Sequence, residues 1–251
     1  MPRKKDERQN RIRQLLMNQQ EMKVSEIAER LTVTPETIRK DLDELEEQGL
    51  VIRSHGSVSL KSVLSQLPLK IRNQDHPDEK RRITMRAIQE IRNGSTIFFD
   101  SGSTIMTGIQ MLRSKKNLKI VTISLPVAIE CTELGFEVYL LGGQIQPQAL
   151  FTYGSMTMDD LKRFHFDLAL LGTCGVLDSG FFGLNSLDDA AFFREVAARS
   201  SRVMILMDRS KIYEKAVFPT LSFAETNMMI TNPLSEEERA RFDGVEKIAE
   251  V

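Results

Sequence analysis

The sequence predicts an α/β protein of two domains, a small helical N-terminal domain and a larger domain with a parallel β-sheet. From residue 96 onward, short apolar runs alternate with helical patterns, which is typical of parallel strands covered by helices on both faces. The first 60 residues instead contain three helical patterns and then two β-prone runs. A chain of 251 residues with 41% hydrophobic and 27% charged residues is long enough for this arrangement. We expect domains at 1–60 and 78–251, joined by a linker at 61–77.

Composition argues against several kinds of site. The net charge is -1, and the first 60 residues contain 11 Lys or Arg and 11 Asp or Glu, so nucleic-acid binding has to be argued from where the charges lie. Two distant cysteines, Cys131 and Cys174, and three histidines form no metal or disulfide pattern, and we expect no metal and no cofactor. No apolar run approaches the ~18 residues of a membrane span, and the start has no export signal, so we expect a cytoplasmic protein.

The stretch Thr32–Gly49 predicts one helix with both ends marked. Thr34 can cap the first free N–H groups, Pro35 suits the first helical position, and Gly49 suits a left-handed stop. An apolar stripe with helical spacing faces inward and consists of Ile38, Leu42 and Leu45. The outward positions are Glu36, Thr37, Arg39, Lys40 and Asp43.

The outward charges of this helix are ordered along its length. Arg39 and Lys40 lie in the early turns, whereas the later turns are acidic. A helix that enters a DNA major groove with its N-terminus first needs this order, because base edges and phosphates meet its early turns. An ordinary capped surface helix is the alternative for this stretch taken alone.

The flanking segments complete a helix-turn-helix pattern with a wing. Residues 8–17 and 25–31 predict two helices before a tight turn, with Ser25 as the cap of the second. Two β-prone runs predict a hairpin with Arg53 and His55 near its tip. Further cations cluster at the start of the chain: Arg3, Lys4, Lys5, Arg8, Arg11 and Arg13. Cations at three separated places suit phosphate contacts around one groove.

This N-terminal block resembles the DNA-binding domain of the DeoR family of bacterial repressors. The matching stretches are Val24–Ala28, Val33–Leu42 and Leu45–Gly56, while Ser57 stands where the family usually has a second glycine. The resemblance implies a winged helix-turn-helix that binds double-stranded operator DNA. The expected DNA-binding residues are Ser25, Thr34, Pro35, Glu36, Thr37, Arg39, Lys40, Arg53 and His55.

The larger domain is predicted from apolar runs that alternate with helical patterns. A helix is expected at 78–91, with Gly94 as its stop. The expected strands are 96–99, 118–121, 138–141, 168–171 and 203–207, with further candidates at 228–230 and 245–248. The expected helices begin near 103 and span 126–134, 159–164 and 188–200, and Ser235 and Glu238 form a capping box for one more.

Polar and glycine residues collect where these strands end, the edge at which parallel sheets bind ligands. In Asp100–Thr104, Gly102 frees the backbone, Ser103 and Thr104 offer hydroxyls, and a helix begins, as in phosphate-binding turns. Lys211 can reach an anion at another strand end. The remaining strand-end residues are Thr122, Ser124, Gly142, Gly143 and Gly172. An ordinary βα turn is the alternative for each motif alone. Neither nucleotide-binding glycine motif occurs, which disfavours a dinucleotide or P-loop nucleotide.

The same residues resemble the C-terminal sensor domain of the DeoR family. The matching stretches are Asp78–Lys80, Asp100–Thr104, Val121–Leu125, Leu141–Gly143, Gly172–Gly175 and Asp208–Lys211. The resemblance implies a Rossmann-like fold related to ribose-5-phosphate isomerase that binds sugar phosphates. Ser101, Gly102, Ser103 and Thr104 would hold the phosphate, with Lys211 near the sugar or phosphate. Asp100 and Asp189 are also expected to contact the effector. Ile123 stands where the family commonly has asparagine, and in the segment that begins at Asp189, Phe193 stands where it has lysine.

The sequence therefore predicts a DNA-binding transcriptional regulator, a repressor of a carbohydrate-metabolism operon relieved by a phosphorylated sugar. A homodimer or homotetramer is expected, because paired half-sites multiply the specificity of one small head. One alternative is a sugar-phosphate isomerase with a DNA-binding head, in which Asp189 would be the base and Phe193 would remove the cation. The other is an architectural DNA-binding protein whose second domain only oligomerises.

Overall fold

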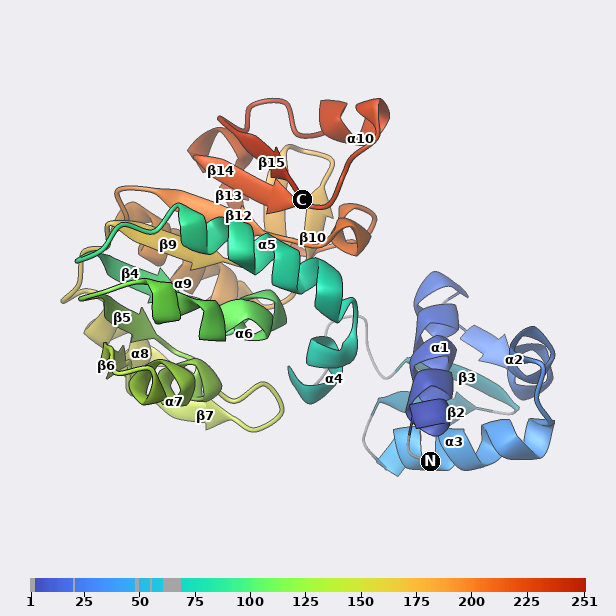
Figure 1. Ribbon diagram of the computed structural model, residues 1–251. Helices are drawn as coiled ribbons and strands as arrows, with labels where there is room; N and C mark the ends of the chain where they lie inside the picture. The colour runs from blue at the N-terminus through green and yellow to red at the C-terminus, as the bar shows by residue number, and fades with distance from the viewer. Residues whose placement is uncertain (1–2, 20, 48–49, 55, 61–68) are drawn as a thin grey trace. The chain divides into compact units, whose positions relative to one another are not determined.

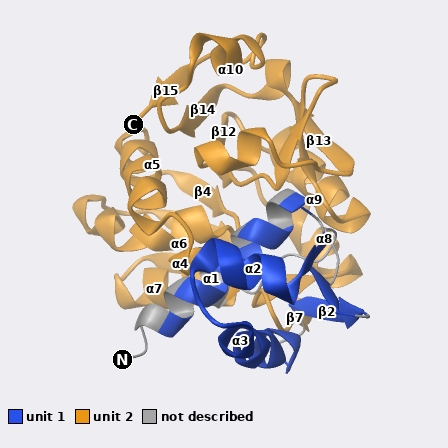
Figure 2. Ribbon diagram, turned by 90° about the vertical axis from the view of Figure 1, so that its right-hand side faces the viewer, with its two compact units in different colours: residues 1–67 blue, residues 68–251 orange. Residues whose placement is uncertain are grey.

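The computed structural model describes residues 3–19, 21–47, 50–54, 56–60 and 69–251. The chain divides into two compact units, residues 1–67 and residues 68–251, which we call the head and the sensor (Figure 2). Among the described residues, no helix has the length and apolar character needed to cross a membrane.

The head contains three helices and a small antiparallel sheet. In chain order its elements are α1 (Arg3–Gln19), β1 (Glu21–Lys23), α2 (Val24–Leu31), α3 (Pro35–Glu47), β2 (Val51–Ser54) and β3 (Ser57–Leu60). The strands pair in the order β1-β3-β2, so the predicted wing hairpin is confirmed and gains a strand that the sequence analysis missed. Apolar side chains from all three helices form the core, including Ile12, Ile27, Ile38 and Leu42.

The helix ends of the head follow local hydrogen bonding. Thr34 Oγ1 accepts the N–H of Thr37 at 3.3 Å, so the predicted cap of α3 is confirmed. The predicted cap at Ser25 is wrong. Because β1 runs directly into α2, the helix starts at Val24, and the Glu26 carboxylate accepts the N–H of Lys23 at 3.2 Å. The predicted stop at Gly49 lies outside the described residues.

The sensor is built on a seven-stranded parallel sheet with the order β15-β14-β12-β9-β4-β5-β6 (Figure 1). Its strands are β4 (Thr96–Phe99), β5 (Lys119–Thr122), β6 (Glu137–Leu140), β9 (Leu168–Leu171), β12 (Val203–Leu206), β14 (Met228–Thr231) and β15 (Ile248–Glu250). The predicted strand at 245–248 is wrong in position, because the last strand begins at Ile248. The other six predicted strands are confirmed to within a residue or two at each end.

Helices cover both faces of this sheet, as the uninterrupted apolar strands predict (Figure 1). One face packs against α5 (Pro77–Gln89), α6 (Ser103–Gly108), the 3-10 helix η1 (Ile109–Ser114) and α7 (Leu125–Glu133). The other packs against α8 (Ser155–Leu161) and α9 (Leu187–Ala198). The short helices η2 (Arg209–Ile212), η3 (Phe223–Glu225) and α10 (Glu236–Ala240) follow, the last with the predicted Ser235–Glu238 capping box.

Three features of the sensor were not predicted. Helix α4 (Leu69–Gln74) lies within the expected linker, and the N–H of Leu69 donates to the carbonyl of Gln148 at 3.1 Å. The strands β7 (Gln144–Gln146) and β8 (Phe151–Tyr153) form a hairpin. The strands β10 (Gly175–Leu177), β11 (Phe181–Leu184) and β13 (Phe218–Ser222) form a separate antiparallel sheet. Phe193 and Ile123 both lie in the core beside these additions, with 5% of each exposed.

A partly buried ion pair and an exposed one, Lys5–Glu44, join the first and third helices of the head. Asp41 of α3 is buried and accepts two hydrogen bonds from the Arg8 guanidinium of α1, one of them at 3.0 Å. Replacing Asp41 with Asn should lower the unfolding free energy of the head by roughly 2 kcal/mol. That is below the ~3–5 kcal/mol of a fully buried pair, because the Arg8 side chain is 24% exposed. Urea denaturation of the full chain measures the change.

Asp43 on the same helix is the matched control. It pairs with Arg53 at the surface, so Asp43→Asn should change stability by no more than ~0.5 kcal/mol. Equal effects of the two substitutions would show that the Arg8–Asp41 pair has no special role in the head.

Candidate DNA-binding surface and effector site

The outward face of α3 carries the residues predicted to contact DNA. Pro35 is its first residue, and Glu36, Arg39 and Lys40 are exposed. Arg39 Nη1 lies 2.8 Å from Glu36 Oε2, so its guanidinium is held along the helix by a weak surface pair that phosphate or a base edge can displace. The Thr34 and Thr37 hydroxyls lie 2.9 Å apart at the start of the same face. The arrangement is that of a reading helix, and the individual DNA contacts stay predictions.

The wing is fastened to α3 through Arg53. Its Nη2 donates to the carbonyl of Arg39 at 2.7 Å, and the guanidinium pairs with Asp43 at 2.7 Å and Glu46 at 3.6 Å. Ser57, where the family resemblance would place glycine, donates to the carbonyl of Ser54 at 2.7 Å and closes the wing turn. Arg53 therefore orients the wing. Its own DNA contact stays a prediction, as does that of the exposed Ser25, and His55 lies outside the described residues.

Asp100 joins two strand ends of the sensor. It is buried after β4, and its carboxylate accepts the N–H groups of Ser101 at 2.5 Å and Gly172 at 3.1 Å. Burial raises the pKa of Asp100, and these N–H groups oppose the rise. A Cβ at Gly102 or at Gly172 would lie 3.1 Å from Asp100 Oδ2, so the carboxylate fits best beside glycine.

The predicted phosphate turn is narrow. Ser101, Ser103 and Thr104 are each less than a tenth exposed, and Gly102 is the most accessible residue of the turn. Thr84 of α5 donates its hydroxyl to the carbonyl of Thr104, which locks α6 against α5. A ligand therefore reaches the hydroxyls of this turn only through a restricted opening.

Two cations that the sequence analysis did not assign to the site lie beside these strand ends. Lys80 of α5 is buried, and its Nζ donates to the carbonyl of Arg72 on α4 at 2.7 Å. Burial lowers the pKa of both residues. The charge of Asp100 raises the pKa of Arg72 in part, and the charge of Asp208 does the same for Lys80. The charge of Lys211 also lowers the pKa of Lys80, so three cations lie near one another at these strand ends. Arg72 was overlooked because it lies in the expected linker.

Asp189, at the start of α9, faces the same region. Burial, followed by the charge of Asp100, raises the pKa of Asp189 to about 6. The Asp189 N–H donates to Ser186 Oγ at 3.2 Å, so Ser186 caps the helix. The site thus combines carboxylates that suit sugar hydroxyls with cations that suit a phosphate.

Some buried polar atoms around this region have no hydrogen-bond partner among the described residues. They are Asn73 Oδ1 on α4, and Thr231 Oγ1 and Asn232 Nδ2 at the end of β14. Each such atom costs ~1–3 kcal/mol unless something pairs with it.

The other predicted strand-end residues have internal partners. Thr122 donates its hydroxyl to the carbonyl of Phe99 at 2.7 Å and accepts the N–H of Ser124 at 3.0 Å, and both residues are fully buried. Gly142 donates its N–H to Asp160 at 3.3 Å. A Cβ at Gly143 would lie 2.5 Å from the carbonyl of Tyr153. These four residues have structural roles, and their contact with an effector stays a prediction.

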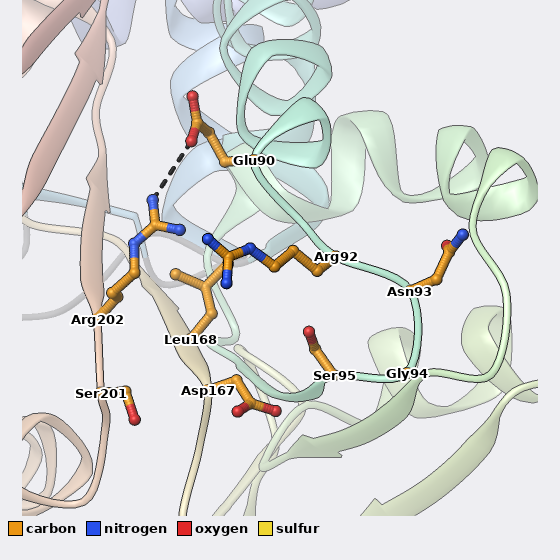
Figure 3. A pocket seen from close by; sticks show the side chains of 9 residues that line it. All are labelled: Glu90, Arg92, Asn93, Gly94, Ser95, Asp167, Leu168, Ser201 and Arg202. Carbon is orange, nitrogen blue, oxygen red and sulfur yellow. Dashed lines mark hydrogen bonds and ion pairs between the residues drawn. The ribbon is translucent and has the colours of Figure 1, made fainter.

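A pocket of about 350 Å³ lies at the opposite, amino edge of the sheet (Figure 3). Arg92 and Arg202 reach toward each other over Leu168, and Glu90 pairs with Arg202 at 3.3 Å (Figure 3). Glu90 also pairs with Arg86 at 2.7 Å. This pocket contains none of the predicted effector residues, and its ion pairs tie α5 to the start of β12.

A helix-turn-helix head followed by an α/β domain with a polar strand-end site defines a ligand-responsive transcriptional regulator. The DeoR-like helix-turn-helix domain matches residues 8–63, and the DeoR C terminal sensor domain matches residues 75–233. The chain belongs to the DeoR family of transcriptional regulators.

Two relatives that align over about nine-tenths of the chain are named as repressors. The chain is 31% identical over 230 residues to the glycerol-3-phosphate regulon repressor of Escherichia coli, which covers 91% of each chain. It is 27% identical to the HTH-type transcriptional repressor GlcR of Bacillus subtilis, over 92% of this chain and 90% of that one. Ribose 5-phosphate isomerase from Plasmodium falciparum aligns with a TM-score of 0.40 at 19% identity, over 54% of this chain and 53% of that one.

The raised pKa of Asp189 makes a pH-dependent contribution to stability. The folded state holds this proton more tightly than the unfolded state, so stability falls as pH rises from about 4 to about 6. Asp189→Asn should therefore raise the unfolding free energy at pH 7.5 by about 1–2 kcal/mol, a figure discounted for partial exposure. Urea denaturation should show no such gain below about pH 4.

The neighbouring Asp188→Asn is the control, because it removes an exposed carboxylate from the same helical turn. It should change stability by ~0.5 kcal/mol or less at either pH. If Asp189→Asn raised the unfolding free energy equally at both pH values, the raised pKa of Asp189 would be contradicted.

Proposed function

We propose that this protein is a cytoplasmic repressor that binds double-stranded operator DNA through α3 and the wing. It releases the DNA when a small phosphorylated sugar binds at the carboxyl ends of the sensor strands. The observation that carries the proposal is the gathering of Arg72, Lys80 and Lys211 beside the Asp100–Thr104 turn. Three cations and the N–H groups of a strand-to-helix turn suit a phosphate, and the carboxylates suit hydroxyls. The glycerol-3-phosphate regulon repressor is named for a compound of this chemical class.

Effector binding involves helix α4. Arg72 lies on this helix, which contacts α6. The hydroxyl groups of the Asp100–Thr104 turn are nearly buried. An effector that engages the turn therefore shifts α4, and α4 follows residues 61–68, which join it to the head in sequence. Binding changes operator affinity only if the effector favours one arrangement over the other, and the coupling is reciprocal.

We propose binding without turnover. Isomerisation of a sugar phosphate needs a base and a group that stabilises the enediolate. Phe193, where the resemblance would place a lysine, packs in the core and supplies no charge. We further propose a homodimer or homotetramer, because one short reading helix contacts only a half-site.

The first test concerns the reading helix. Arg39→Ala should weaken operator binding by roughly 1–3 kcal/mol if Arg39 reads a base, and Lys40→Ala should lower the salt dependence by about one phosphate contact. A fluorescence titration with an operator fragment from upstream of the gene, repeated at several salt concentrations, measures both. Lys162→Ala, just after α8, removes the same charge from the sensor and should leave binding unchanged. Unaltered operator affinity in both head variants would remove α3 from the account.

The second test concerns the sensor. Thermal unfolding of the full chain is measured with glycerol 3-phosphate, glucose 6-phosphate, ribose 5-phosphate and fructose 6-phosphate. A ligand at 100 times its dissociation constant should stabilise the sensor by roughly 2.7 kcal/mol. Arg72→Met should abolish that gain. Arg92→Met, at the amino-edge pocket, should preserve it. A gain retained by Arg72→Met and lost in Arg92→Met would move the effector to the opposite edge.

A further inference from the structure

The sensor exposes an apolar surface around one edge of its sheet. Half of the exposed large hydrophobic side chains among the described residues come from β6, the β7–β8 hairpin and the start of α8: Tyr139, Leu140, Ile145, Leu150, Tyr153 and Met156. We call these six residues the edge surface. Figure 1 shows β6, β7 and α8 together at the end of the sheet opposite β15.

The hairpin is rooted beside β6, so the surface has a fixed frame. Thr152 of β8 donates its N–H to the carbonyl of Ile123 at 2.8 Å and its hydroxyl to the carbonyl of Leu141 at 2.7 Å. The Tyr139 ring packs edge-on against Phe164, with centroids 5.3 Å apart. The edge surface is therefore part of the ordered sensor.

Charge is absent from this segment. Residues 138–158 include no Asp, Glu, Lys, Arg or His, in a chain of which 27% of the residues are charged. Exposed side chains of the edge surface total on the order of 600 Å², which lies within the range of the largest apolar patch of a monomer. They lie on both sides of β6, because the consecutive residues Tyr139 and Leu140 point to opposite faces of the sheet. Tyrosine and methionine with few charges is the composition of an interface centre. The composition indicates a surface that another protein covers.

The backbone of β6 supports the same conclusion. β6 pairs with β5 on one side and has no strand partner on the other among the described residues. Edge strands are normally guarded by charges, proline or bulges, and β15 at the other edge carries Glu250 and follows Lys247. β6 has only Glu137, at its start. Among the described residues, no strand pairs with its outer N–H and C=O groups.

We propose that the edge surface is a dimer interface and that its occupant is a second copy of this chain, an inference that rests on the oligomer of the proposed function. Two β6 strands can pair antiparallel about a two-fold axis and continue the sheet across both copies. In the registers that centre on Val138 or Tyr139, Glu137 of one copy lies opposite an uncharged position of the other, so no like charges meet. The apolar area approaches the ~800 Å² per partner of a standard interface. Paired heads then match paired half-sites.

Sedimentation velocity of the full chain over a micromolar dilution series tests the proposal. The parent should be a dimer or a tetramer. Leu140→Lys and Ile145→Lys together should weaken self-association at least about tenfold and weaken operator binding with it. Val217→Lys is the matched control, because Val217 is 49% exposed elsewhere on the sensor, and it should leave both unchanged. An oligomeric parent whose lysine variant associates equally well overturns the edge surface alone. A monomeric parent overturns the oligomer of the proposed function as well.

A covalent test covers the case in which the lysine variant does not fold, which circular dichroism detects. Under mild oxidation Tyr139→Cys should form a disulfide-linked dimer, because residues near a two-fold axis approach their own copies. The parent, with Cys131 buried and Cys174 partly buried, is run alongside and should not cross-link. If Tyr139→Cys stays monomeric on a non-reducing gel in that case, the edge surface is overturned.

Discussion

The sensor depends on one buried carboxylate. Asp100 sits where β4 ends, and its oxygens accept N–H groups from its own turn and from the turn after β9, the neighbouring strand. An ionised carboxylate in such a place costs several kcal/mol unless donors and cations surround it. The backbone N–H groups of both turns and the nearby Arg72 offset part of that cost, although burial still raises the pKa of Asp100. The same arrangement that stabilises Asp100 also brings glycine turns and cations to the place where we propose that the effector phosphate binds.

The sequence was informative where structure is decided locally. Uninterrupted apolar runs fixed the parallel strands, and side-chain caps at Thr34 and Ser235 marked helix starts that the structure confirms. Ser25 misled because β1, which precedes α2, forms only when the distant β3 pairs with it. Arg72 was not predicted as a site residue, because its position also depends on segments that are distant in sequence. Its helix is six residues long, and its place beside Asp100 comes from packing on α6. The β10-β11-β13 sheet joins segments about 40 residues apart, which no local pattern reports.

Two departures from the family pattern have a common physical meaning. Ile123 and Phe193 stand where the family commonly has asparagine and lysine, and both are buried in the same apolar cluster of the sensor. At those positions this chain has apolar side chains that pack in the core, in place of polar side chains. The cations beside the strand ends come from three helices, α4, α5 and η2, which carry Arg72, Lys80 and Lys211. In the proposed function, an effector that binds here would be held by cations from these three helices.

In the proposed function, one chain couples a metabolite site to a DNA-reading helix. The most direct measurement is the operator dissociation constant of the full chain, at fixed salt, with and without a saturating concentration of a phosphorylated sugar that stabilises the sensor. The account predicts that this ligand weakens operator binding about tenfold or more, a coupling of at least ~1.4 kcal/mol. An operator affinity that the bound ligand leaves unchanged would contradict it.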